Sequence, residues 1–130
     1  DNFNKGKTQN YGWAIASDGD HYKGAFDSVP GGSTKKYPLY KSHKDHGFIE
    51  PLKSFTPAIG ISEITKIKDK SYVVSSLRDK SLYFFELSDN HEIINLKRVE
   101  VFERVRDLTF KNNKLYFFLE DTASIGIITL

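Results

Sequence analysis

The second half of the sequence repeats itself at a separation of about 43 residues. Matching positions carry the same kinds of residue, and the turn residues between the matched segments also recur. A three-strand unit therefore occurs twice in succession. The matched pairs are Ile61–Lys66 with Val105–Phe110, Tyr72–Ser76 with Leu115–Leu119, and Ser81–Leu87 with Ser124–Leu130.

Short β-rich runs alternate with polar turns throughout this half, and no run has the spacing of apolar residues typical of a helix. The turns are predicted at 68–70, 78–80, 88–90 and 111–113. This pattern predicts an all-β, antiparallel fold. The predicted strands are Ile61–Ile67, Ser71–Ser76, Leu82–Leu87, Val99–Phe102, Val105–Phe110, Lys114–Leu119 and Ile125–Leu130.

Units of several strands that recur every ~40–50 residues are typical of β-propellers. A small twisted sheet cannot bury both of its faces alone, so neighbouring sheets must stack to complete the core. Two repeats are fewer than usually define a repeat fold, and a β-sandwich with two similar meanders stays open as an alternative.

Composition divides the chain near Pro57. Residues 1–57 are rich in Gly, Pro, Asn, Asp, Ser and Lys, which favours turns and loops. We expect residues 1–57 to be a loop-rich segment of a preceding propeller blade, and residues 58–130 to be two successive blades. The last blade is expected to be incomplete, since the strand at Val99–Phe102 has no counterpart in the second repeat. We therefore expect sequence upstream of Asp1 to be missing.

Charge and residue usage exclude several classes of protein. The 19 basic and 17 acidic residues give a net charge of +2, without the concentrated basic footprint of a nucleic-acid-binding protein. The absence of cysteine excludes disulfides, thiolate metal sites and a cysteine nucleophile. No apolar run approaches the ~18 residues of a membrane span, and we expect no signal peptide within these residues.

Four motifs, in order along the chain, resemble those of one enzyme family. Asn10–Trp13 is similar to its Asn-Tyr-Gly-Trp-Pro element, with Ala14 in place of proline. Ser76–Arg78 resembles its Ser-Leu-Lys/Arg strand end, Arg104–Asp107 its Arg-x-Arg-Asp motif, and Leu115–Asp121 its following strand and acidic turn. The family is the soluble glucose/sorbosone dehydrogenases that depend on pyrroloquinoline quinone (PQQ). The resemblance covers essentially the whole chain, but only about the last third of a typical member.

The resemblance implies a partial six-bladed β-propeller, with about two to three blades of antiparallel four-stranded sheets. It also implies oxidation of a small-molecule sugar by hydride transfer to PQQ, with calcium in the full-length protein and a periplasmic or secreted location. In the family, the histidine base and the main calcium loop lie upstream of the Asn-Tyr-Gly-Trp element. We therefore expect no catalytic residue in this chain, and no activity from it alone.

Four residues match cofactor-contacting positions of the family: Arg78, Arg104, Arg106 and Thr56. Guanidinium groups suit a planar tricarboxylate such as PQQ, because they pair with carboxylates in a bidentate way. The alternative for the arginines is salt bridges with Glu103, Asp107 or Glu63. The alternative for Thr56 is an ordinary turn hydroxyl.

Other candidates give weak signals. Asp18 and Asp20 lack the spacing of a calcium loop, and His43 and His46 lack a third zinc ligand, so no metal site is predicted. Trp13, Tyr11 and Tyr22 suit either a sugar-facing rim or burial between blades. Two other functions stay open: a self-associating, homo-oligomeric propeller module without catalysis, and a carbohydrate-binding relic.

Overall fold

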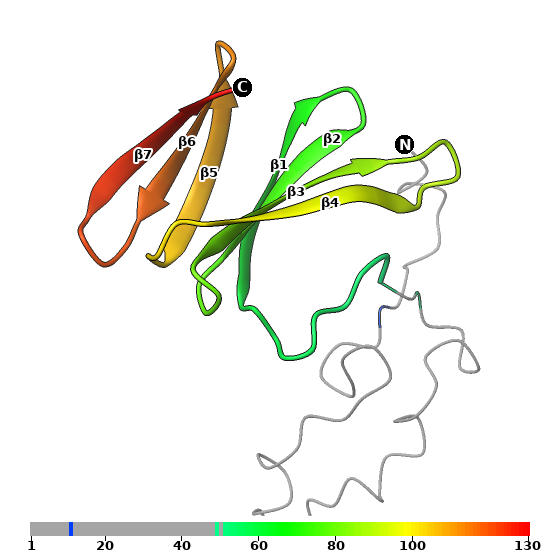
Figure 1. The fold of residues 1–130 in the computed structure, drawn as a ribbon, viewed down its shortest axis with the longest axis horizontal. Coiled ribbons are helices and arrows are strands. Elements are labelled where there is room, and N and C mark those ends of the chain that lie inside the picture. Colours follow the sequence, from blue (N-terminus) through cyan, green and yellow to red (C-terminus); the bar gives the residue numbers. More distant parts are fainter. Residues whose placement is uncertain (1–10, 12–48, 50) are drawn as a thin grey trace, which may run out of the picture. The chain divides into compact units, whose positions relative to one another are not determined.

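The computed structural model describes Tyr11, Ile49 and residues 51–130, and Leu52–Leu130 form one compact unit (Figure 1). This part is all-β, without a helix, and its antiparallel strands form two sheets with the orders β1-β2-β3-β4 and β5-β6-β7. The predicted fold class is confirmed. The strands are β1 (Ile61–Lys68), β2 (Ser71–Ser76), β3 (Ser81–Leu87), β4 (Ile93–Glu100), β5 (Val105–Lys111), β6 (Lys114–Leu119) and β7 (Ser124–Thr129). Most of the expected loop-rich segment 1–57 lies outside the described residues.

The two sheets share one cross-strand register. Val73 of β2 pairs with Phe84 of β3 in the first sheet. The residues 43 positions later, Tyr116 of β6 and Ile127 of β7, pair in the same way in the second sheet. The internal repeat is therefore a repeat of strand pairing, and not of residue types alone.

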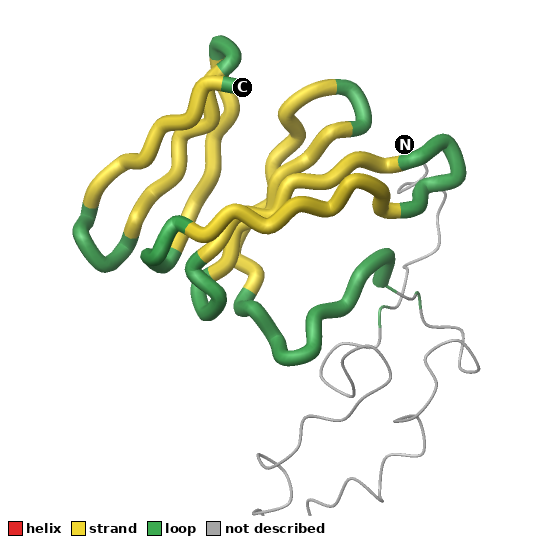
Figure 2. The backbone as a smooth tube through the Cα atoms, viewed as in Figure 1, coloured by secondary structure: helices red, strands yellow, loops and turns green. Residues whose placement is uncertain are grey.

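Short turns join the strands of each sheet (Figure 2). Asn112 and Asn113 connect β5 to β6, with φ angles of 52° and 60°. A two-residue hairpin turn with positive φ at both positions matches the twist of the strands, and asparagine tolerates this conformation better than most residues. The polar pair therefore explains why this hairpin forms where the sequence predicts a turn.

The fourth strand differs from the prediction. We expected Val99–Phe102, but β4 spans Ile93–Glu100, and residues 101–104 form the connection to β5. β4 is an outer strand that is exposed along most of its length, and Asn95 has a φ of 55° where the β3–β4 register shifts. The burial of β4 therefore does not alternate along the strand as it does in a half-buried strand.

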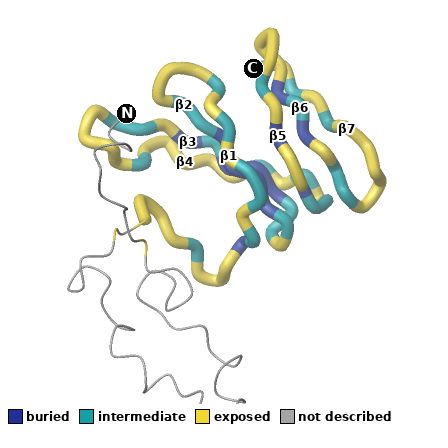
Figure 3. The backbone as a smooth tube through the Cα atoms, turned by 180° about the vertical axis from the view of Figure 1, so that it is seen from behind, coloured by how far each residue is buried: buried dark blue, intermediate teal, exposed yellow. Residues whose placement is uncertain are grey.

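The main core lies between the two sheets. Figure 3 shows buried segments on β3, β5 and β6, the strands that carry most of its residues. The second sheet approaches the first through β5, which contacts β1 and β2. The buried members are Val73, Leu82, Val105, Leu108, Leu115 and Phe117.

A second apolar cluster covers the opposite face of the first sheet. Val74, Tyr83 and Phe85 pack there with Ile59, and the ring of Phe55 meets the ring of Tyr83 edge-on at 5.1 Å. Successive residues of a strand point to opposite faces, so β2 and β3 are buried on both sides. The segment before β1 therefore covers the face that the second sheet leaves free.

The outer face of the second sheet stays exposed. Phe118, Ile125 and Ile127 are 39%, 67% and 57% exposed. In the repeat, Ile125 and Ile127 correspond to Leu82 and Phe84, which pack in the core between the sheets. The second sheet thus presents to solvent the face that the first sheet buries.

Candidate functional site

The candidate site is one end of the two-sheet unit, where three connections meet: the β2–β3 turn (77–80), the β4–β5 connection (101–104) and the β6–β7 turn (120–123). The backbone N–H groups of Val101 and Phe102 donate to the carbonyl oxygen of Lys80, at 2.9 and 3.2 Å. The N–H of Glu120 donates to the carbonyl oxygen of Arg104 at 2.9 Å. Backbone hydrogen bonds therefore hold the three connections together.

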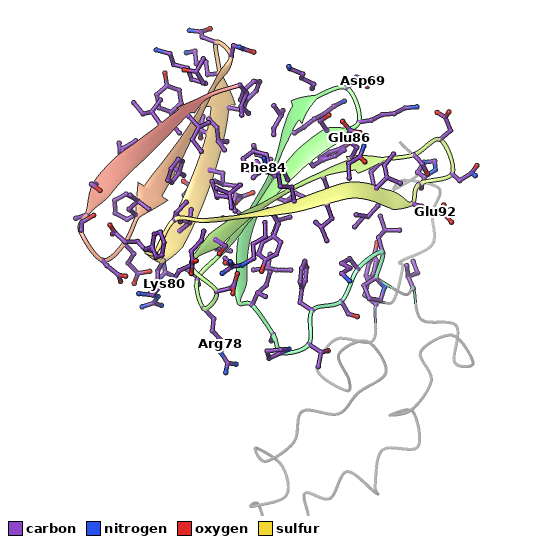
Figure 4. All side chains as sticks on the ribbon, in the orientation of Figure 1. Asp69, Arg78, Lys80, Phe84, Glu86 and Glu92 are labelled. Carbon is purple, nitrogen blue, oxygen red and sulfur yellow. The ribbon has the colours of Figure 1, made fainter. Side chains whose placement is uncertain are left out.

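Arg78 lies in the β2–β3 turn, and its side chain points away from the sheet (Figure 4). Its backbone N–H donates to the carbonyl oxygen of Ile59 at 2.9 Å, and the N–H of Asp79 donates to the same oxygen at 3.2 Å. The guanidinium group has no ion pair or hydrogen bond among the described residues. Arg78 therefore combines a backbone fixed by hydrogen bonds with a guanidinium group that has no partner among the described residues.

Arg104 and Arg106 meet on a single carboxylate. Glu120 Oε1 lies 3.2 Å from Arg104 Nη1, and Glu120 Oε2 accepts a hydrogen bond from Arg106 Nη2 at 2.6 Å. Arg106 lies at a shift in the β5–β6 register, between Val105 and Asp107. The structure therefore brings these two predicted residues together on one carboxylate.

For Arg104 and Arg106, the alternative expectation of salt bridges was right in kind but wrong in partner. Glu103 accepts hydrogen bonds from the N–H and the Oγ1 hydroxyl of Thr122, at 3.0 and 2.8 Å. Asp107 and Glu63 each accept from the backbone N–H of the following residue. Glu120, which the sequence analysis missed, pairs with both arginines. The acidic turn at the end of the Leu115–Asp121 motif was the sequence signal that could have found it.

Thr56 is not joined to the arginines by any hydrogen bond in the described part of the chain. It is exposed, and it precedes Pro57 through a cis peptide bond. The structure therefore places Thr56 in the segment before β1, and it stays a prediction as a cofactor contact.

A second cluster holds the β2–β3 turn and was not predicted. Arg98 Nε and Nη2 donate to Asp79 Oδ2 and Oδ1 at 2.7 and 3.2 Å, and the Tyr83 hydroxyl donates to Oδ2 at 2.6 Å. The hydrogen bonds from Arg98 and then from Tyr83 lower the pKa of Asp79 to about 2. Burial, followed by the bond to Asp79, raises the pKa of Tyr83. The cluster therefore fixes the turn that carries Arg78.

Four of the five cations at this end have an acidic partner. Besides the pairs already described, Lys80 Nζ lies 3.1 Å from Asp121 Oδ2, and this bond lowers the pKa of Asp121. Acidic side chains of the unit itself therefore neutralise most of the positive charge at this end, and the Arg78 guanidinium is the exception among the described residues. The five cations are Arg78, Lys80, Arg98, Arg104 and Arg106.

The chemistry of these donors suits carboxylate groups. A guanidinium group offers five N–H donors in a rigid fork. Glu120 engages one terminal nitrogen of Arg104 and one of Arg106, so further donors are left on both groups. Arg78 adds a third guanidinium at the same end of the unit.

The described residues contain no group of three or more histidine, cysteine, aspartate or glutamate side chains that could hold a metal ion. Of the aromatic candidates, Tyr11 is described and is half exposed. The other weak candidates of the sequence analysis lie outside the described residues; these are Trp13, Tyr22, Asp18, Asp20, His43 and His46.

A shallow hollow lies on the outer face of the second sheet. It has a volume of about 160 Å³, and apolar and aromatic side chains dominate its lining. It includes none of the arginines, so it is separate from the candidate site. The lining residues are Asp107, Leu108, Thr109, Tyr116, Phe117, Phe118 and Ile125.

Comparison with known proteins gives one match. A family model described as Glucose / Sorbosone dehydrogenase matches residues 1–129. No curated protein and no solved structure matches the chain. The described part of the chain contains no helical segment with the length and hydropathy of a membrane span.

Proposed function

Because the chain belongs to the glucose/sorbosone dehydrogenase family, we propose that it forms one wall of a PQQ pocket in a sugar dehydrogenase-like β-propeller. Arg78, Arg104 and Arg106 bind the carboxylates of the quinone. The observation that carries this proposal is the placement of all three guanidinium groups at one end of the unit, two of them on a shared carboxylate.

The quinone, when bound, supplies the hydride acceptor for oxidation of a small-molecule sugar. The residues of this chain orient the quinone by charge-assisted hydrogen bonds, which fix position as well as add affinity. The Asp79–Arg98–Tyr83 cluster holds the turn that presents Arg78. We assign the base that accepts the sugar hydroxyl proton to no residue of this chain. Calcium and a periplasmic or secreted location belong to the same proposal.

Calorimetric titration of the chain with PQQ, in the presence of calcium, tests the proposal. We expect saturable binding, and loss of that binding when Arg78, Arg104 and Arg106 are all replaced by alanine. The matched control removes three exposed lysines without ion pairs in the described structure: Lys97, Lys111 and Lys114. An unchanged affinity in the arginine variant, or an equal loss in the lysine variant, contradicts the assignment.

The exposed outer face of the second sheet favours a second function, that of a self-associating module. Phe118, Ile125 and Ile127 form an apolar face of the kind that the first sheet buries. Contiguous exposed apolar surface marks interaction sites in soluble proteins. Solution mass, recorded beside the titration, tests this function: a well-folded oligomer that does not bind PQQ supports it over the first proposal.

A further inference from the structure

Glu120 stands between the two arginines of the proposed pocket, and the quinone-binding role leaves it without a function. The backbone fixes its position. Leu119, the last residue of β6, pairs with Val105, and the next N–H, that of Glu120, donates to the carbonyl oxygen of Arg104 at 2.9 Å. The carboxylate therefore starts from a position beside Arg104 that the sheet itself determines.

The side chain of Glu120 is the least exposed of the three. Its relative exposure is 29%, against 43% for Arg104 and 50% for Arg106. Each of its oxygens faces a different guanidinium group, at 3.2 Å and 2.6 Å. One carboxylate thus holds both groups in the way that a bound carboxylate ligand would hold them.

A ligand carboxylate that approaches this pair meets a negative charge already in place. Like charges at close range repel, and partial burial limits the screening of that repulsion by salt. Arg78 has no such acidic partner among the described residues. The two parts of the proposed pocket therefore differ: Arg78 is open to an anion, whereas Arg104 and Arg106 are already paired.

We propose that Glu120 is an internal competitor of anionic ligands. Its carboxylate occupies the anion-binding position between Arg104 and Arg106, and a ligand carboxylate must displace it in order to bind. Glu120 lowers the affinity of the site for anions and prevents weakly binding anions from occupying it. This inference rests on the proposed pocket for the identity of the ligand. The competition itself depends only on the two guanidinium groups and the carboxylate between them.

Replacing Glu120 by glutamine tests the inference, because the variant keeps the shape and removes the charge. Calorimetric titrations of the 130-residue chain would use two ligands, PQQ with calcium and citrate. We expect E120Q to bind both about tenfold more tightly than the wild type, which corresponds to about 1.4 kcal/mol. E120A should also bind more tightly, and circular dichroism verifies that both variants are folded.

Glu92→Gln is the matched control. Glu92 is exposed, its carboxylate has no ion pair in the described structure, and its substitution removes the same charge (Figure 4). E92Q should bind both ligands as the wild type does. An equal gain in E92Q would assign the effect to net charge and overturn the inference.

The two ligands separate the failure of this inference from the failure of the proposed function. Tighter citrate binding by E120Q, with no PQQ binding by any variant, supports the competitor and contradicts the quinone pocket. PQQ binding by the wild type that weakens in E120Q supports the pocket and overturns the competitor, because Glu120 would then orient the arginines. Absence of citrate binding by folded E120Q and E120A overturns the inference as well.

Discussion

The Ser62 hydroxyl of the first sheet lies 2.5 Å from the carbonyl oxygen of Val105 and donates a hydrogen bond to it. The two residues are 43 positions apart, about the length of one repeat. Ser62 Oγ also lies 2.8 Å from the hydroxyl of Ser75, a fully buried residue. The other acceptor within reach of the Ser75 hydroxyl, the carbonyl oxygen of Glu63, is farther away at 3.5 Å. The Ser75 hydroxyl therefore donates its hydrogen bond to Ser62 Oγ. A short chain of hydroxyls therefore joins the two sheets.

Ser62→Ala should destabilise the protein. It removes the donor to the Val105 carbonyl and leaves the buried Ser75 hydroxyl with its weaker acceptor, at a cost of about 1–3 kcal/mol in the free energy of unfolding. Urea denaturation measures this cost. Ser124→Ala removes an exposed hydroxyl and should change the free energy by about 0.5 kcal/mol at most. Equal effects of the two substitutions would show that the serine chain does not stabilise the sheet–sheet contact.

The repeat offers a matched pair of positions for testing the core. Leu82 is fully buried between the sheets, whereas its repeat equivalent Ile125 is 67% exposed. Leu82→Ala should cost about 2–5 kcal/mol of unfolding free energy, because it removes buried methyl groups and leaves a cavity. Ile125→Ala should cost about 0.5 kcal/mol or less. A cost at Ile125 similar to that at Leu82 would mean that the outer face is covered in solution, and sedimentation analysis would identify self-association as the cause.

Gly126 leaves space for the ring of Phe117. A Cβ atom at position 126 would overlap that ring, which is buried in the core. The equivalent pair in the first sheet reverses the sizes, with Val74 opposite Tyr83. Gly126→Ala should therefore cost about 1–3 kcal/mol of unfolding free energy through overpacking. Combining it with Phe117→Leu should recover part of the loss relative to the sum of the two single effects. Strict additivity would contradict direct contact.

The Asp79 cluster makes stability depend on acid pH. Hydrogen bonds from Arg98 and Tyr83 hold the pKa of Asp79 at about 2, below its ordinary value of 3.8. Because the folded-state pKa is depressed, the stabilisation is fully present above pH 3.8 and is lost as the pH falls through this range toward about 2. Asp79→Asn should cost about 1–2 kcal/mol near neutral pH, and the difference from the wild type should shrink over that window.

Urea denaturation at several pH values measures this dependence. Asp69→Asn is the control, because Asp69 is an exposed carboxylate whose ion pair with Lys66 spans 3.6 Å. Its substitution should have a small effect at every pH, as expected for an exposed pair. A constant difference between Asp79→Asn and the wild type from neutral pH to about pH 2 would contradict the role of the ionised carboxylate.

The sequence predicted the bounds of strands that polar turns delimit. Ser71–Ser76 and Lys114–Leu119 have the predicted bounds, because a polar turn marks each end of these inner strands. The prediction failed for Ile93–Glu100, where both faces are largely exposed and Asn95 interrupts the regular backbone.

The candidate site was predictable only in part for a related reason. The Arg-x-Arg-Asp motif pointed to Arg104 and Arg106, but Glu120 and the Asp79–Arg98 pair were missed. Those partners are set by strand register, since Tyr83 lies opposite Arg98 and Leu119 opposite Val105. Register depends on contacts between distant residues, which residue types alone do not specify.

The buried face of the first sheet and the exposed face of the second have a consequence for assembly. The contact between the sheets is heterologous, since it joins two different faces. A further sheet, placed on the second sheet as the second is placed on the first, would cover one apolar face and expose another. The addition of sheets therefore ends only when the rotation between successive sheets closes a ring, or when a sheet with a polar outer face caps the stack. With Ile125 and Ile127 on its outer face, the second sheet has the composition of an internal repeat and not that of a cap.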